Sequence, residues 1–129
     1  MNGPADVGIL QGRRILVVED EPFIALTLED MLTELGCEIA GLASQVSEAL
    51  EMIGRESIDA AVLDVNLGNQ KIDPVADLLA TRKLPFVFTT GYGRAGVPPG
   101  HTGRGCVEKP FRLDDLARVL SAELRGRVF

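Results

Sequence analysis

The sequence lacks the features that define several common protein classes. No apolar run among its 129 residues approaches the length that spans a membrane, and Met1–Gln11 does not have the charged-then-apolar order of a signal peptide. It has only two cysteines, Cys37 and Cys106. Because both fall inside apolar segments, they fit reduced core thiols better than a disulfide or a metal pair. We therefore expect a cytoplasmic protein that does not act at a membrane.

Excess positive charge is also lacking. The net charge is −6 and the isoelectric point is near 4.7, which argues against a nucleic-acid-binding surface. The chain has no internal repeats, and no DNA-binding motif follows the last apolar segment. We therefore expect any output to come from this domain or from its protein partners. The length and the 46% hydrophobic content suit one globular domain.

Apolar runs with the character of buried strands alternate with segments of helical periodicity. The strand-like runs are residues 13–18, 37–42, 60–63, 86–90 and 106–108. The helical segments are residues 22–35, 46–53, 73–81 and 113–124. This alternation predicts an α/β fold with a five-stranded parallel sheet and helices on both faces. Ser44 or Ser47 is expected to cap the second helix, Asp73 the third, and Gly36 to end the first.

Two segments depart from this pattern. Residues 1–12 have the character of a mobile leader, so the folded domain is expected over residues 13–127. Residues 91–105 contain six glycines and the pair Pro98-Pro99, a density that disfavours a helix. The fourth helix is therefore expected to be short or replaced by a glycine- and proline-rich loop.

Polar residues interrupt the apolar runs where the predicted strands end. Glu19 and Asp20 end the first strand, Asp64 the third, Thr90 the fourth and Lys109 the fifth. In an open parallel sheet the carboxyl ends of the strands share one edge, where ligands bind. We therefore expect these five side chains to converge in space.

Three converging carboxylates require a compensating cation. Two like charges about 4 Å apart repel by roughly 1–4 kcal/mol, depending on the access of solvent. Oxygen ligands with room for water suit Mg²⁺, with Mn²⁺ as an alternative ion. Lys109 adds a positive charge at the same edge, and Thr90 adds a hydroxyl group. Together with a nucleophilic aspartate, these groups point to phosphoryl transfer.

Four motifs in this order carry a family resemblance. They are residues 15–21 (ILVVEDE), 62–66 (VLDVN), 88–92 (FTTGY) and 108–111 (EKPF). Each is weak alone, but four in order with suitable spacing are specific. From about Arg13 to Leu124 the sequence resembles the receiver domain of two-component response regulators, which implies a flavodoxin-like fold.

The resemblance also implies a role for each residue of the cluster. Asp64 would accept a phosphoryl group from the phosphohistidine of a sensor histidine kinase or a histidine phosphotransferase. Asp20 and Asp64 would ligate Mg²⁺ directly, Glu19 would act through a water molecule, and the main-chain carbonyl of Asn66 would complete the protein ligands.

By the same resemblance, Thr90 would move to bond the phosphoryl group and Lys109 would pair with it. The bond from Lys109 to Pro110 would be cis. Phosphorylation is then expected to reorder the loop over residues 91–105 and to change contacts with a downstream protein partner.

Two features depart from the usual receiver pattern. Cys106 stands three residues before the lysine, where receivers usually have an aromatic residue that responds to the threonine, and the fourth helix is missing. With the run Phe88–Tyr92, these features resemble the FAT GUY subfamily of single-domain receivers. That subfamily is associated with alphaproteobacterial stress signalling and with kinases of the HWE or related types.

Several residues have a simpler alternative role. Asp64 could cap a turn, and Glu19, Asp20 and Glu21 could form a solvated acidic turn before Pro22. Thr89 is as natural a strand residue as Thr90. Tyr92 either packs on the surface or shields the phosphoryl group from water, and His101 is expected to be a solvated loop residue.

Three functions compete at this point. The leading interpretation is a single-domain response regulator that catalyses only its own phosphorylation and dephosphorylation and is otherwise not an enzyme. It would signal by protein contact or act as a phosphoryl shuttle or sink. A phosphohydrolase of the haloacid dehalogenase type needs a second acid two residues after the nucleophile, where this sequence has Asn66. A degenerate receiver acting as a constitutive binding module would not need to retain the whole cluster.

Overall fold

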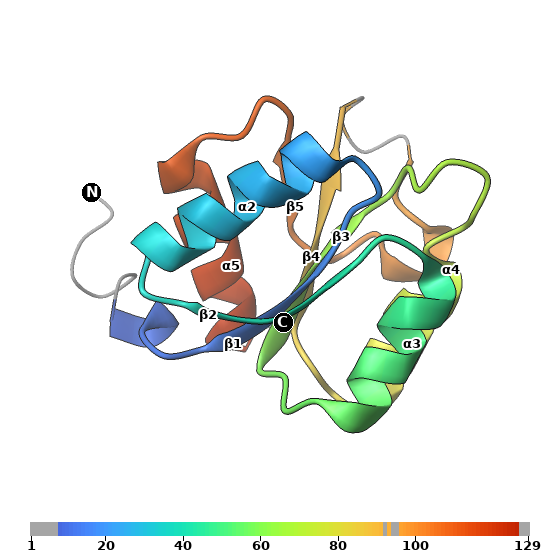
Figure 1. The fold of residues 1–129 in the computed structure, drawn as a ribbon, viewed down its shortest axis with the longest axis horizontal. Helices are drawn as coiled ribbons and strands as arrows, with labels where there is room; N and C mark the ends of the chain where they lie inside the picture. The colour runs from blue at the N-terminus through green and yellow to red at the C-terminus, as the bar shows by residue number, and fades with distance from the viewer. Residues whose placement is uncertain (1–7, 92, 94–95, 127–129) are drawn as a thin grey trace.

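The computed structural model describes residues 8–91, 93 and 96–126, and these form one parallel sheet between two layers of helices (Figure 1). The strand order is β2-β1-β3-β4-β5, and each neighbouring pair is parallel. The strands are β1 (Arg14–Val18), β2 (Glu38–Ala43), β3 (Ala60–Asp64), β4 (Phe86–Thr90) and β5 (Cys106–Glu108). The predicted five-stranded parallel sheet is therefore confirmed.

Two helices cover each face of the sheet. Helices α2 (Pro22–Glu34) and α5 (Leu113–Leu124) lie on one face, and α3 (Val46–Arg55) and α4 (Asp73–Thr81) lie on the other (Figure 1). Side chains alternate between the two cores, so that Val87 packs toward α2 and α5 while Phe86 and Phe88 pack toward α3 and α4. Every residue of β3 and β4 is buried, as expected for the middle of a parallel sheet.

The start of α3 differs from the prediction that Ser44 or Ser47 caps it. Gln45 occupies the cap position without a capping side-chain hydrogen bond. Both the hydroxyl and the amide of Ser44 donate to the Glu48 carboxylate, at 2.9 and 3.0 Å, so this serine is engaged elsewhere. The amide of Val46 instead donates to Oε1 of Gln70, 2.7 Å away, from the loop that follows β3.

The ends of two other helices are partly as predicted. Gly36 follows the end of α2 with a φ of +92°, a backbone conformation that favours glycine. Asp73, predicted as a cap, is instead the first residue of α4, and Ile72 holds the cap position without a side-chain hydrogen bond. The carboxylate of Asp73 thus lies in the first turn, where the helix dipole favours an acid.

The end of the expected N-terminal leader packs on the domain. Residues 8–10 form a helical turn, and Leu10 is fully buried in the core beneath α2 and α5. Arg13 Nε donates to the carbonyl of Ile9 at 2.8 Å, and the amide of Gly12 donates to the carbonyl of Gly36 at 2.8 Å. Leu10 is part of this core, so the last residues of the segment expected to be a mobile leader pack on the folded domain. Residues 1–7 and the predicted domain end at residue 127 lie outside the described residues.

The segment between β4 and β5 contains no α-helix in its described part, which agrees with the prediction for the fourth helix. Its only helical element there is the 3₁₀ turn η1 (Pro99–His101). The ring of His101 packs edge-on against Phe86, with centroids 5.5 Å apart, and its Nε2 lies 2.7 Å from Oδ1 of Asp77. Since this side chain is only 10% exposed, the prediction of a solvated His101 is wrong. The ring therefore covers part of the aromatic core formed by Phe86 and Phe88.

A second contact fixes the same segment to α5. The guanidinium of Arg104 lies over the ring of Phe86, 4.2 Å from its centroid, and Nη1 pairs with Oε2 of Glu123 at 3.3 Å. The other carboxylate oxygen of Glu123 accepts the amide of Gly105 at 2.8 Å. This segment is therefore held to α4 through His101 and to α5 through Glu123.

Among the described residues, no helix combines the length and apolar character needed to cross a bilayer.

Candidate functional site

Three carboxylates meet where β1 and β3 end. The oxygens of Glu19, Asp20 and Asp64 all lie within 4.8 Å of one another. Parallel pairing of Val18 with Leu63 brings the two strand ends to the same level of the sheet. Glu19 and Asp64 are buried, whereas Asp20 is exposed at the rim. The structure thus brings together the three acids that the sequence analysis expected to converge.

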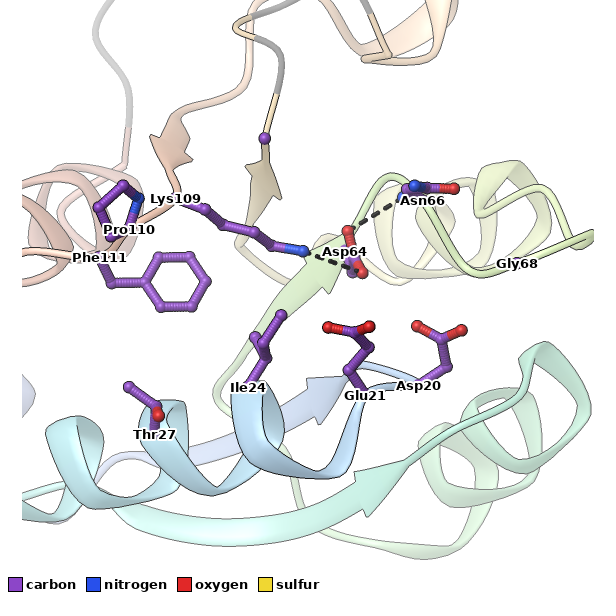
Figure 2. A pocket seen from close by; sticks show the side chains of 11 residues that line it. Asp20, Glu21, Ile24, Thr27, Asp64, Asn66, Gly68, Lys109, Pro110 and Phe111 are labelled. Carbon is purple, nitrogen blue, oxygen red and sulfur yellow. Dashed lines mark hydrogen bonds and ion pairs between the residues drawn. The ribbon is translucent and has the colours of Figure 1, made fainter.

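Asp64 is held from two sides. It ends β3 and is 2% exposed. Its Oδ1 accepts the amide of Asn66 at 3.0 Å, and its Oδ2 lies 3.3 Å from Nζ of Lys109 (Figure 2). The amide of Val65 donates to the carbonyl of Thr89, which ties the loop after β3 to β4. These contacts fix the orientation of the carboxylate that faces the site.

Lys109 supplies positive charge to the cluster. It follows β5, and its amide donates to the carbonyl of Thr90 at 2.8 Å. The bond to Pro110 is cis, as the family resemblance implied. Nζ also lies 3.5 Å from Oε1 of Glu19. One ammonium group among three carboxylates leaves the cluster with an excess of negative charge.

Glu19 shows the cost of this arrangement. The pKa of its carboxyl is raised from 4.5 to about 7, chiefly by burial and to a smaller extent by the nearby Asp64, while the amide of Glu21 and the charge of Lys109 act in the opposite direction. Oε2 accepts the Glu21 amide at 3.1 Å. Oε1 is buried and has no hydrogen-bond partner among the described residues. A buried oxygen of this kind, beside two further carboxylates, fits a hard divalent cation such as Mg²⁺.

In the metal-free protein, Glu19→Gln should raise the free energy of unfolding at pH 8 by about 1–3 kcal/mol. The folded-state pKa of about 7 lies above the ordinary value of 4.5, so folding favours the protonated carboxyl. The contribution of this group to stability therefore falls as the pH rises from 4.5 to about 7, and glutamine removes that fall. Urea unfolding with a chelator at pH 4.5 and pH 8 measures the effect. A gain of the same size at both pH values would contradict it.

A pocket of about 710 Å³ opens beside the acidic cluster. Figure 2 shows Lys109 reaching toward Asp64, with Ile24 and Phe111 on the neighbouring wall. The residues that line the pocket are Asp20, Glu21, Ile24, Thr27, Asp64, Asn66, Gly68, Gly91, Lys109, Pro110 and Phe111. One end of the pocket is acidic and the other is largely apolar. A small ring could therefore pack against the apolar end while a group attached to that ring lies beside Asp64. The apolar wall was not predicted, because Ile24 and Phe111 have the sequence signature of ordinary helix and loop residues.

The remaining predicted residues have different surroundings. Thr90 is fully buried at the end of β4, and Gly91 rather than Thr90 lines the pocket. Cys106 is half-buried, pairs in register with Phe88 and packs against the core beneath α3 and α4. The thiol therefore occupies the position at which the usual receiver pattern has an aromatic ring. Tyr92 lies outside the described residues.

A comparison with protein-family models matches the response regulator receiver domain over residues 15–121. The chain therefore belongs to the response regulator receiver domain family, whose members are signalling modules of two-component systems and are generally non-catalytic. This confirms the family assigned from the four motifs.

Individual relatives agree with this family. The chain is 31% identical over 121 residues to the transcriptional regulatory protein PdtaR of Mycobacterium tuberculosis, covering 90% of this chain and 59% of PdtaR. It is 33% identical over 116 residues to the phyllosphere-induced regulator PhyR of Methylorubrum extorquens, covering 85% of this chain and 43% of PhyR. The chain thus spans roughly half of these curated relatives.

The solution structure of SdrG from Sphingomonas melonis Fr1 is similar over almost its whole length. It superposes with a TM-score of 0.79 at 44% identity, covering 89% of this chain and 98% of SdrG. The BeF₃-activated conformation of SdrG superposes with a TM-score of 0.74 at 46% identity, covering 86% of this chain and 95% of SdrG.

Proposed function

We propose that this chain is a single-domain response regulator of the cytoplasm that accepts a phosphoryl group on Asp64 in the presence of Mg²⁺. The donor is the phosphohistidine of a sensor histidine kinase, of the HWE or a related type, or of a histidine phosphotransferase. The phosphorylated chain signals by contact with a downstream protein or passes the group on as a shuttle or sink.

The observation that carries this proposal is the surroundings of Asp64. A buried carboxylate lies between a lysine ammonium 3.3 Å away and two further carboxylates within 4.8 Å. A structural aspartate capping a turn would not need that acidic neighbourhood, because like charges raise the free energy of the folded state. A site for a cation and a phosphoryl group accounts for all three acids and for Lys109.

The proposed transfer uses the groups that surround the pocket. One carboxylate oxygen of Asp64 forms a bond to phosphorus while the nitrogen–phosphorus bond of the donor breaks, which gives an acyl phosphate and a free imidazole. Asp20, Asp64 and the Asn66 main-chain carbonyl would hold Mg²⁺ directly, and Glu19 would hold it through water. Bound Mg²⁺ would neutralise charge on the incoming phosphoryl group.

After transfer, two residues would sense the new group. Lys109 would exchange its pairing with the Asp64 carboxylate for pairing with a phosphoryl oxygen, and the Thr90 hydroxyl would move to donate a hydrogen bond to another. Because Gly91 follows directly and lines the pocket, a displacement of Thr90 would be passed to the segment between β4 and β5.

Incubation with acetyl phosphate and Mg²⁺, followed by intact-mass measurement, tests this function. We expect one phosphate adduct that forms with Mg²⁺, is suppressed by a chelator and is cleaved by hydroxylamine as an acyl phosphate should be. Absence of an adduct at saturating Mg²⁺ would contradict the proposal and favour a constitutive binding module. Continuous release of phosphate from unrelated phosphomonoesters would favour a phosphohydrolase.

The surface of α2 beside the pocket offers a docking site for the donor protein. Phe23 is 85% exposed and Leu26 52% exposed, and they are one helical turn apart. Ile24 and Thr27, on the same helix, line the pocket. A protein that docks on Phe23 could therefore place its phosphohistidine in the pocket.

Phe23→Ala should slow phosphotransfer from a phosphorylated sensor kinase by about tenfold or more, because an exposed aromatic at an interface often carries over 1.4 kcal/mol of binding. Labelling by acetyl phosphate should be unchanged, since the small donor needs no docking surface. Leu42→Ala, at a 40% exposed leucine on β2, is the matched control. Equal transfer rates for the Phe23 variant and the parent would place the docking surface elsewhere.

A further inference from the structure

The loop between β3 and α4 carries one of the proposed Mg²⁺ ligands on its backbone. Asn66 contributes a main-chain carbonyl, so its position depends on the path of the loop rather than on a side-chain rotamer. Asn66 and Gly68 both line the pocket. Whatever fixes this loop therefore fixes part of the proposed metal site.

Local contacts give the loop its shape. The amide of Asn66 donates to Asp64 at 3.0 Å, and the amide of Gln70 donates to the carbonyl of Leu67 at 2.9 Å across an isolated antiparallel bridge. Gly68 has a φ of +58°, which suits the tight turn. Leu67 is 3% exposed and belongs to the core beneath α3 and α4.

One side chain links this turn to a helix far away in sequence. Oε1 of Gln70 accepts the amide of Val46, the first residue of α3, at 2.7 Å. The first amides of a helix have no partner within the helix, so this is a capping hydrogen bond. The bond joins residues 24 positions apart in the sequence. It supplies the cap that Gln45 does not provide and that Ser44, which bonds Glu48, does not provide either.

We propose that Gln70 is a positioning residue for the acidic site, an inference that rests on the proposed function. By capping α3 it holds the turn over residues 67–70 at a fixed distance from the helix. The stretch that contains Asn66 is then tied at one end to Asp64 and at the other to α3. This double attachment presents the Asn66 carbonyl beside Asp20 and Asp64 before the cation arrives, so little ordering accompanies binding.

Three variants separate this role from a general effect on folding. Gln70→Met has a similar length but lacks the accepting oxygen, and Gln70→Glu retains an oxygen that helix N-termini favour. Gln45→Ala alters the residue in the cap position, which makes no capping side-chain hydrogen bond. Mg²⁺ alone is the ligand, and its dissociation constant is followed by NMR shifts of the Asn66 and Gly68 amides.

Gln70→Met should raise the Mg²⁺ dissociation constant about three- to tenfold, because the loop must then be ordered when the cation binds, and should speed hydrogen exchange at the Val46 amide. With acetyl phosphate, the Mg²⁺ concentration at half-maximal rate should rise by the same factor. The rate at saturating Mg²⁺ should change less than about twofold, because the nucleophile is untouched. Gln70→Glu and Gln45→Ala should bind Mg²⁺ no more weakly than the parent.

Equal Mg²⁺ affinity in Gln70→Met and the parent would overturn the inference, as would an equal loss in Gln45→Ala or a failure of Gln70→Glu to restore binding. The parent protein separates this result from the larger proposal. If the parent binds Mg²⁺ and is phosphorylated but Gln70→Met matches it, only the role of Gln70 is wrong. If the parent neither binds Mg²⁺ nor accepts phosphate, the proposed function falls and this inference falls with it.

Discussion

Replacing Asp64 with asparagine is expected to abolish covalent phosphorylation, whether the donor is acetyl phosphate or a phosphohistidine. An amide lacks the charged oxygen that forms the acyl phosphate, so the labelling rate should fall by more than about 100-fold. The fold should persist, because the asparagine oxygen can still accept the Asn66 amide that Oδ1 accepts at 3.0 Å. Intact mass after incubation with Mg²⁺ and each donor measures the effect.

Asp59→Asn is the matched control for this substitution. Asp59 directly precedes β3, at the opposite end of the strand from Asp64, and accepts the amide of Arg14 at 2.8 Å. Its asparagine variant should be labelled at the parental rate, since it changes the charge of the protein by the same amount without altering the site. An adduct on Asp64→Asn would mean that another residue is the acceptor, and the proposed function would then be wrong.

Much of the fold and of the site could be predicted because the signals are local. β1 and β3 are short apolar runs that end abruptly in acids, and geometry places the carboxyl ends of parallel strands along one edge. The convergence of Glu19, Asp64 and Lys109 could therefore be predicted, because each of them stands at the end of a strand-like run in the sequence. The glycine content of residues 91–105 likewise predicted the loss of a helix, because conformational preference is summed over a short window.

Other features depend on contacts between distant residues and leave no local signal. Ser44 precedes α3 as a capping residue should, yet it bonds Glu48, and the cap comes from Gln70 in another loop. Leu10 belongs to the core although the segment around it, residues 1–12, has the sequence character of a mobile leader. The raised pKa of Glu19 follows mainly from burial, which is set by the assembled sheet rather than by the acidic motif itself.

The segment between β4 and β5 illustrates a further difference. Its glycines and prolines predicted a loop, but not that His101 and Arg104 would both attach this loop to the ring of Phe86. Gly96 also lies close to the end of β3, because a Cβ at this position would meet Cγ2 of Val65, the residue after that strand, at 2.9 Å. A signal from Asp64 could reach this segment through Val65 as well as through Thr90. The attachment to α5 should then determine how much of the segment can respond.

That attachment is testable at Glu123, where alanine is expected to lower the free energy of unfolding by about 2–4 kcal/mol. The carboxylate is 3% exposed, accepts the Gly105 amide at 2.8 Å and pairs with Arg104 at 3.3 Å. Truncation leaves a partly buried amide without this acceptor and a guanidinium without this anion, and both losses are more costly than the loss of an exposed pair. Urea unfolding gives the free energy, and hydrogen exchange at Gly105 should become faster in the folded state.

Asp115→Ala supplies the comparison on the same helix. Asp115 pairs with Arg118 at 3.1 Å, but the two side chains are 43% and 62% exposed, so its loss should cost less than about 1 kcal/mol. Glu123→Gln should fall between the two, because the amide oxygen can still accept from Gly105 while the charge is gone. If Glu123→Ala and Asp115→Ala were equally mild, Arg104 and Glu123 would not anchor the segment. The His101–Asp77 contact would then hold it to the rest of the fold, and His101→Ala should become the more disruptive substitution.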